Sequence, residues 1–102
     1  MNYVDELRDA ILRLHGVESR HIESVPVKEM FQGQTVWEGV VEVFELIGHP
    51  KAQRAYAWAH DANGGKKRHV TVLHTDKITS PFLAVRAAII QEFRDNAATE
   101  EN

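Results

Sequence analysis

Six histidines, at positions 15, 21, 49, 60, 69 and 74, are the residues of this sequence best suited to metal binding or proton transfer. Neutral imidazole is a common metal ligand, and it titrates near physiological pH. A zinc site needs three or four ligands, and the sequence contains no His-x-x-x-His pair and no cysteine. Only His60 and His69 are expected to lie close together, on one face of a hairpin. We therefore expect no metal and no cofactor.

Other residues that could catalyse a reaction have a simpler structural interpretation. Thr79 and Ser80 precede a predicted helix and are typical capping residues, while Glu38 and Glu42 share one face of a predicted strand without an identifiable partner. The absence of cysteine excludes thiol nucleophiles and disulfides. The local sequence pattern predicts no catalytic residue, and only a site assembled from distant residues would supply one. Among the possible functions, an enzyme is therefore the one that the sequence supports least.

Basic residues are few and dispersed. Lysine and arginine number 12 against 15 aspartates and glutamates, a net charge of −3, which argues against a broad electrostatic attraction to nucleic-acid phosphates. The run Lys66, Lys67, Arg68 lies at a predicted hairpin tip, where charged residues usually solvate the turn. His49 and Lys51 lie in another predicted turn.

The elements that must position these residues begin with an amphipathic helix. Apolar Leu7, Ile11 and Leu14 recur at intervals of three and four, and charged residues fill the other face. Asn2 is the expected N-cap and Gly16 the expected C-terminal stop.

Extended segments follow. Residues 18–31 alternate weakly between apolar and polar types, and Pro26 would confine them to a sheet edge, as a further N-terminal strand. Residues 35–46, rich in valine and aromatic residues, predict a strand. Residues 54–61 and 68–74 predict a hairpin.

The turn of that hairpin decides which side chains share a face. Centred on Asn63-Gly64 or on Gly64-Gly65, a two-residue turn places Ala57 and Ala59 on one face with Val70 and Val72. The opposite face then carries larger side chains, namely Tyr56, Trp58, His60, His69, Thr71 and Leu73.

The last element is a helix that begins at Ser80 as N-cap, with Pro81 in its first turn. Phe82, Val85, Ile89 and Phe93 form its apolar stripe, and its alanines suit close packing on the small residues of the hairpin. The expected fold is α+β and two-layered, α-β-β-β-α with or without the extra edge strand, an antiparallel sheet with both helices on one face. Residues 1–96 would form one domain and residues 97–102 a flexible tail.

Helix, three-stranded meander and helix resembles the double-stranded-RNA-binding domain. Gly48-His49-Pro50 is similar to the Gly-Pro-His-type loop of that family, and Ala84, Ala87 and Ala88 match the alanines of its last helix. Pro81, Phe82 and Val85 occupy the positions of its three phosphate-binding lysines, so the lysine motif is missing. The whole chain also resembles small uncharacterised bacterial proteins, a likeness that implies no activity.

Composition and patterning favour a soluble domain. The longest apolar run falls far short of the roughly 18 residues that span a bilayer, and the acidic N-terminus is unlike a secretory signal. We therefore expect a cytoplasmic protein without membrane contact.

The uncovered aromatic face suggests a function. We expect a small non-enzymatic binding or self-associating module, forming a homodimer or binding a protein partner through Tyr56, Trp58, His60, His69 and Thr71. Two other readings stay open: residues 18–31 fold over the aromatics, or the aromatics are core and the alanines lie outside. The alternative function is a nucleic-acid-binding domain with a degenerate phosphate-binding motif, whose contacts would be His49, Lys51, Lys66, Lys67 and Arg68.

Overall fold

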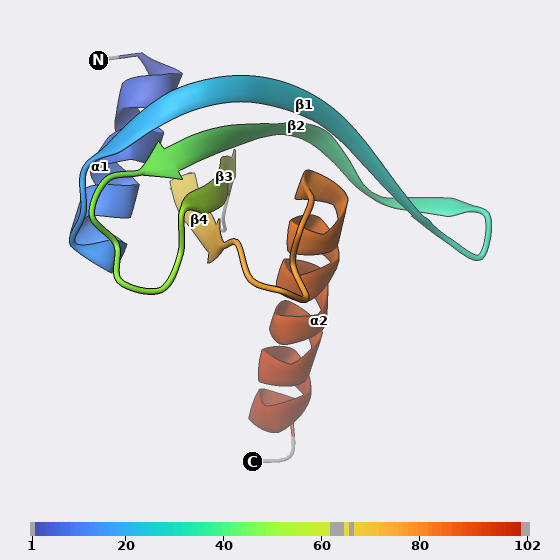
Figure 1. The fold of residues 1–102 in the computed structure, drawn as a ribbon. Coiled ribbons are helices and arrows are strands. Elements are labelled where there is room, and N and C mark those ends of the chain that lie inside the picture. Colours follow the sequence, from blue (N-terminus) through green and yellow to red (C-terminus); the bar gives the residue numbers. More distant parts are fainter. Residues whose placement is uncertain (1, 62–64, 66, 101–102) are drawn as a thin grey trace.

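The computed structural model describes residues 2–61, 65 and 67–100, which form two helices and one four-stranded sheet (Figure 1). In chain order the elements are α1 (Tyr3–His15), β1 (Ser19–Phe31), β2 (Gln34–Leu46), β3 (Arg54–Asp61), β4 (Lys67–Leu73) and α2 (Pro81–Glu100). The predicted α+β class is confirmed, and the segment around Pro26 is a full strand. α2 continues to Glu100, into the predicted tail, whose residues 101–102 lie outside the described part. No helix in the described ranges is long and apolar enough to cross a membrane.

α1 begins and ends where its capping residues predict. The side chain of Asn2 accepts a hydrogen bond of 2.9 Å from the backbone N–H of Asp5. Gly16 adopts a left-handed conformation, φ 73°, and its N–H donates to the carbonyl of Leu12. Both contacts satisfy backbone groups that a helix end leaves without partners.

The sheet is antiparallel, in the order β1-β2-β3-β4, but its strands pair over very different lengths. β1 and β2 pair along almost their whole length, from Ser19↔Leu46 to Phe31↔Gln34. β2 pairs with β3 only from Glu42↔Ala57 to Glu45↔Arg54. Beyond that point, residues 25–31 of β1 and 34–41 of β2 pair only with each other and form a two-stranded arm that arches past α2 (Figure 1). Pro26 lies on the edge strand, as predicted.

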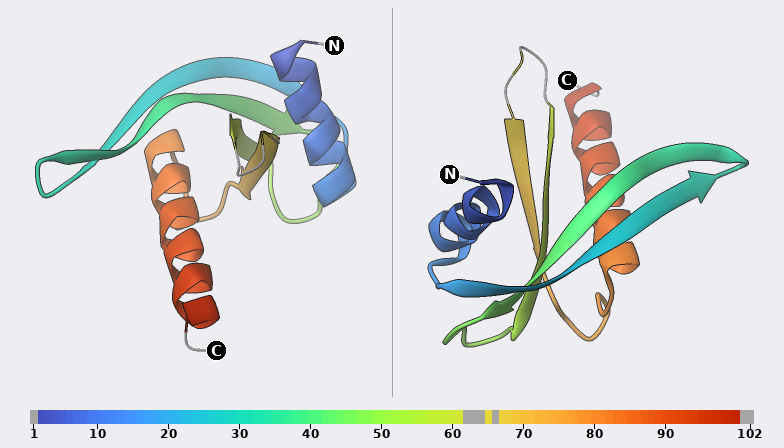
Figure 2. Two further views of the ribbon diagram at one scale, coloured as in Figure 1. Left: turned by 180° about the vertical axis from the view of Figure 1, so that it is seen from behind. Right: turned by 90° about the horizontal axis from the view of Figure 1, so that it is seen from above.

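The two helices cover opposite faces of the sheet, so the expected placement of both on one face is wrong. α1 packs with Leu7 and Ile11 on Phe44, Ala55 and Ala57. α2 packs with Ala84 and Val85 on a second cluster, which contains Val27, Val41, Val43, Tyr56 and Trp58. The right view of Figure 2 shows the β3–β4 hairpin between the two helices.

The predicted assignment of side chains to the faces of the sheet is wrong because the turn between β3 and β4 is longer than predicted. The last strand pair is Asp61↔Lys67, which leaves five connecting residues instead of two. An odd number of connecting residues reverses which side chains share a face, because side chains alternate along each strand. Trp58 therefore pairs with Val70 and Tyr56 with Val72, while Ala57 pairs with Thr71. Of the two predicted turn centres, Asn63 and Gly64 lie outside the described residues.

Burial also corrects the expected open aromatic face. Tyr56 is 2 % exposed and Trp58 is 3 % exposed. Both belong to the cluster beneath α2, so the aromatics are core, but the alanines are not outside, because Ala55 and Ala57 are fully buried too. The small residues Ala55 and Ala57 accept α1 on the other face.

Candidate binding site

A cleft opens between α2 and the face of β3 and β4 that α2 only partly covers. It has a volume of about 630 Å³, within the range of about 300–1,000 Å³ typical of small-molecule sites. Four elements and one connecting segment line it. Its lining consists of Trp37, Trp58, His60, Arg68, Val70, Thr71, Val72, Leu73, Ile78, Val85, Ala87, Ala88, Ile89, Gln91 and Glu92.

Two tryptophans, the only ones in the chain, form part of the cleft lining. The rings of Trp37, in β2, and Trp58, in β3, meet edge to face with centroids 5.6 Å apart and an interplanar angle of 67°. This arrangement is favourable for aromatic pairs. The pair bridges the two strands beyond the point where their backbones stop pairing.

Gly39 makes room for one of these rings. A Cβ atom built on Gly39 would lie 3.0 Å from Cη2 of Trp37 and 3.3 Å from its Cζ2. The Trp37 indole therefore packs against the backbone of β2 at Gly39, two residues further along the same strand. The absent side chain of Gly39 lets Trp37 take part in the cleft lining.

α2 supplies one wall through residues at helical spacing. Val85, Ala88 and Glu92 follow at intervals of three and four, so they lie on one side of the helix. The helix begins as predicted, since the backbone N–H of Leu83 donates to the Ser80 hydroxyl at 3.2 Å. Ala84 and Val85 are fully buried and hold the first turns against the sheet. Of the predicted stripe, Phe82 is instead half-exposed, and the Phe93 side chain is not among those described.

Charged groups of both signs line the cleft from different elements. Arg68 comes from β4, where it pairs across the hairpin with His60, and Glu92 comes from α2. Both side chains belong to exposed residues, and neither has an ion-pair partner within the part of the chain that the structure describes. The cleft is therefore a mainly apolar hollow with charges of both signs at its rim.

The structure divides the five residues predicted for the interaction face. Tyr56 is buried, and its hydroxyl shares a hydrogen bond of 2.7 Å with Nδ1 of His74. Trp58 and His60 reach the cleft. Thr71 also lines the cleft, but its hydroxyl is directed to Nε2 of His15 in α1, 2.6 Å away. His69 lies on this same α1 side, opposite Ala59. The expected proximity of His60 and His69 on one face is therefore wrong.

The residues predicted for nucleic-acid contact are not brought together either. Nδ1 of His49 accepts hydrogen bonds of 3.0 Å from the backbone N–H groups of Lys51 and Ala52, so it stabilises its own turn. This turn precedes β3, whereas Lys67 and Arg68 pair with the far end of β3, roughly 25 Å along an eight-residue strand. Lys67 forms an ion pair of 3.6 Å with Glu6. Lys66 lies outside the described residues.

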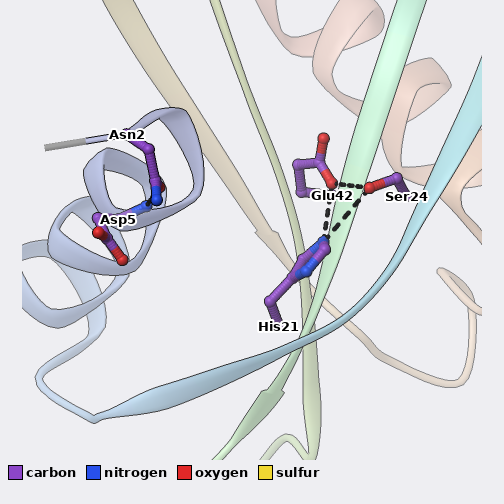
Figure 3. Close-up of polar contacts among 5 residues, drawn as sticks. All are labelled: Asn2, Asp5, His21, Ser24 and Glu42. Carbon is purple, nitrogen blue, oxygen red and sulfur yellow. Dashed lines mark hydrogen bonds and ion pairs between the residues drawn. The ribbon is translucent and has the colours of Figure 1, made fainter.

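A serine, a histidine and a glutamate meet on β1 and β2, and sequence reasoning missed this cluster (Figure 3). Nε2 of His21 lies 2.8 Å from Oε1 of Glu42 and 3.4 Å from the Ser24 hydroxyl, which also donates to Oε1 of Glu42. A catalytic triad needs the two ring nitrogens to contact the acid and the nucleophile separately. Here one nitrogen and one carboxylate oxygen make all the contacts. The cluster satisfies a buried carboxylate and does not activate the serine.

His15, in α1, and Tyr56, in the cluster beneath α2, have shifted pKa values. Burial, and secondarily the neighbouring His49, lowers the pKa of His15 below its ordinary value. The two imidazole rings have their centroids 6.5 Å apart. Burial also raises the pKa of Tyr56, an effect that nearby Arg54 opposes and Glu23 reinforces. Over the described ranges, no three histidine or acidic side chains group as a metal site would require.

A second hollow, the arm groove, lies between the end of the β1–β2 arm and α2. It has a volume of about 640 Å³, and its apolar lining consists of Met30, Phe31, Val36, Ile89 and Ile90. Ile89 also lines the cleft, so the two hollows adjoin along α2. At the rim of the arm groove, Glu29 and Arg86 form an ion pair of 2.7 Å.

Comparisons with known proteins add no relative from which a role could be transferred. The chain matches no protein-family model, no curated protein and no solved structure.

Proposed function

We propose that this protein is a small non-enzymatic binding module and that its ligand occupies the cleft between α2 and the β3–β4 face. One observation carries the proposal: both tryptophans and charges of both signs line a single hollow of small-molecule size. Apolar and aromatic linings with a few polar groups are typical of ligand sites. Trp58 and His60 belong to the face that the sequence pattern singled out, but here α2 turns that face into a cleft.

Tryptophan fluorescence offers a direct test, because both tryptophans of the chain line the cleft. We would titrate the protein with N-phenyl-1-naphthylamine, a neutral apolar dye. We expect saturable dye emission with energy transfer from the tryptophans. Ala87→Leu, which adds bulk to the lining, should weaken this uptake several-fold. Gln53→Leu places a leucine at an exposed position between β2 and β3, outside the cleft lining, and should leave the uptake unchanged. Uptake that does not saturate, or that Ala87→Leu leaves intact, would refute the cleft as the site.

Self-association is the second candidate, and the arm groove favours it. Phe31 is 64 % exposed and Met30 is 48 % exposed at the end of the arm, beside the apolar hollow that they help to line. A projecting apolar tip next to an apolar groove allows two copies to exchange tips about a two-fold axis. Sedimentation analysis at micromolar concentration should then show a homodimer. Phe31→Ser should shift it to monomer, while Phe82→Ser, at an exposed phenylalanine of α2 outside the arm groove, should not. A wild-type monomer would eliminate this candidate.

A further inference from the structure

The charges of the cleft indicate what kind of ligand fits it. Arg68 projects from β4 on the same face as Trp58 and Val70, because Arg68 pairs with His60 and side chains two residues apart share a face. Glu92 projects from α2 four residues after Ala88, on the side that lines the cleft. A cation therefore lines the cleft from the sheet, and an anion lines it from α2.

These two charges do not neutralise each other. No ion pair joins Arg68 to Glu92, and neither has another ion-pair partner in the described chain. The arm groove is different, since its Glu29 and Arg86 are paired at 2.7 Å. The cleft thus offers two separate charges to a ligand, whereas the ion pair at the rim of the arm groove is already formed.

We propose that the cleft binds a small zwitterion with an apolar body, of which a free aromatic amino acid is the simplest example; this inference rests on the proposed function. The carboxylate of the ligand would meet Arg68 and its ammonium group would meet Glu92. Its apolar body would lie against Trp58, Val70 and Ile78. A ligand with a single charge would meet one favourable and one unfavourable group, and an uncharged ligand would leave both charges unused.

Four probes separate these contributions: L-phenylalanine, 3-phenylpropionate, phenethylamine and 3-phenylpropan-1-ol. All four contain a phenyl group. In the order given, they carry both charges, only the negative charge, only the positive charge and no charge. None absorbs at the red edge of the indole band, so tryptophan emission reports binding of each. We expect L-phenylalanine to bind most tightly.

Two charge-removing variants then assign each contact. Arg68→Gln should weaken binding of L-phenylalanine and 3-phenylpropionate by about two- to fivefold, the effect of one solvent-exposed ion pair, and leave phenethylamine no weaker. Glu92→Gln should weaken L-phenylalanine and phenethylamine by a similar factor and leave 3-phenylpropionate no weaker. Arg20→Gln, which removes an exposed arginine paired with Glu45 elsewhere, is the matched control and should change none of the four.

The outcomes distinguish this inference from the proposed function beneath it. If the neutral alcohol or a singly charged probe binds as tightly as L-phenylalanine, the cleft is a ligand site but the zwitterion inference is wrong. The inference also fails if L-phenylalanine binds best and neither variant weakens it. If none of the four probes binds and the neutral dye is also excluded, the proposed function itself fails.

Discussion

The hydroxyl oxygen of Tyr3, in the first turn of α1, accepts a hydrogen bond of 2.8 Å from the backbone N–H of Ala59 in β3. Pairing between β2 and β3 ends at Ala57, so β2 supplies no partner for Ala59. A helix side chain thus takes the place of a neighbouring strand where the sheet divides. The contact also ties α1 to the strand that carries Trp58.

Tyr3→Phe should therefore destabilise the protein by about 1 kcal/mol, because it leaves a partly buried N–H without its acceptor while keeping the ring. Urea unfolding would measure the change. An unaltered free energy of unfolding would show that the N–H finds water or another acceptor.

Trp58→Ala should reduce the free energy of unfolding by about 3–5 kcal/mol, as expected for truncation of a core aromatic. Trp58→Phe retains an aromatic ring and should cost less. Guanidinium unfolding monitored by circular dichroism would measure both. A folded Trp58→Ala protein with nearly wild-type stability would instead support an exposed position for this residue.

Gly39→Ala should displace the Trp37 indole, because the new Cβ would lie 3.0 Å from Cη2. We expect a reduced near-UV dichroism signal from the Trp37–Trp58 pair and a loss of stability on the order of 1 kcal/mol or more from overpacking. In a Trp37→Leu background the same substitution should cost less, since the clashing ring is gone. Strictly additive effects in this double-mutant cycle would contradict the proposed contact.

The lowered pKa of His15 predicts a loss of stability in acid. As the pH falls through about 6.5, the unfolded chain binds a proton at this site more readily than the folded protein, so protonation favours unfolding. The contribution is fully present above that pH. His15→Gln should make the unfolding free energy less dependent on pH between 5 and 8 than in the wild type. Identical pH profiles for both proteins would exclude this role.

Duplex RNA should bind no more tightly than the non-specific range of about 10⁻⁴ to 10⁻⁶ M at physiological salt. The basic residues lie at opposite ends of β3, and Val85, at one of the positions where the resembled family has lysine, is fully buried. Titration by fluorescence anisotropy would measure the affinity. A tight complex that Lys67→Gln and Arg68→Gln weaken would favour the nucleic-acid alternative.

Local signals in the sequence were sufficient for much of the fold. Asn2, Gly16 and Ser80 predict the observed caps because capping depends on a few neighbouring backbone groups. Pro26 predicts an edge strand because proline lacks the donor that a central strand requires.

The faces of the sheet could not be obtained in the same way. They depend on whether the β3–β4 connection has an odd or an even number of residues, and glycine-rich segments are compatible with both. That single difference placed Val70 and Val72 on the aromatic face instead of the alanine face. The contacts of Glu42 with His21 and Ser24 depend on the register between β1 and β2, which local sequence does not encode. The cleft was out of reach for a similar reason, because its lining comes from β2, β3, β4 and α2, whose relative placement local sequence does not encode either.

The short pairing between β2 and β3 also has a consequence for how the molecule opens. A two-stranded ribbon is barely stable by itself, so the arm depends on α2, which contacts it through the Val27, Val41 and Val85 cluster and the Glu29–Arg86 pair. Fraying of α2 would release the arm, while α1 and the paired ends of β2, β3 and β4 would retain their own core. The arm and α2 should therefore exchange their amide hydrogens as one cooperative unit, ahead of the region around Phe44.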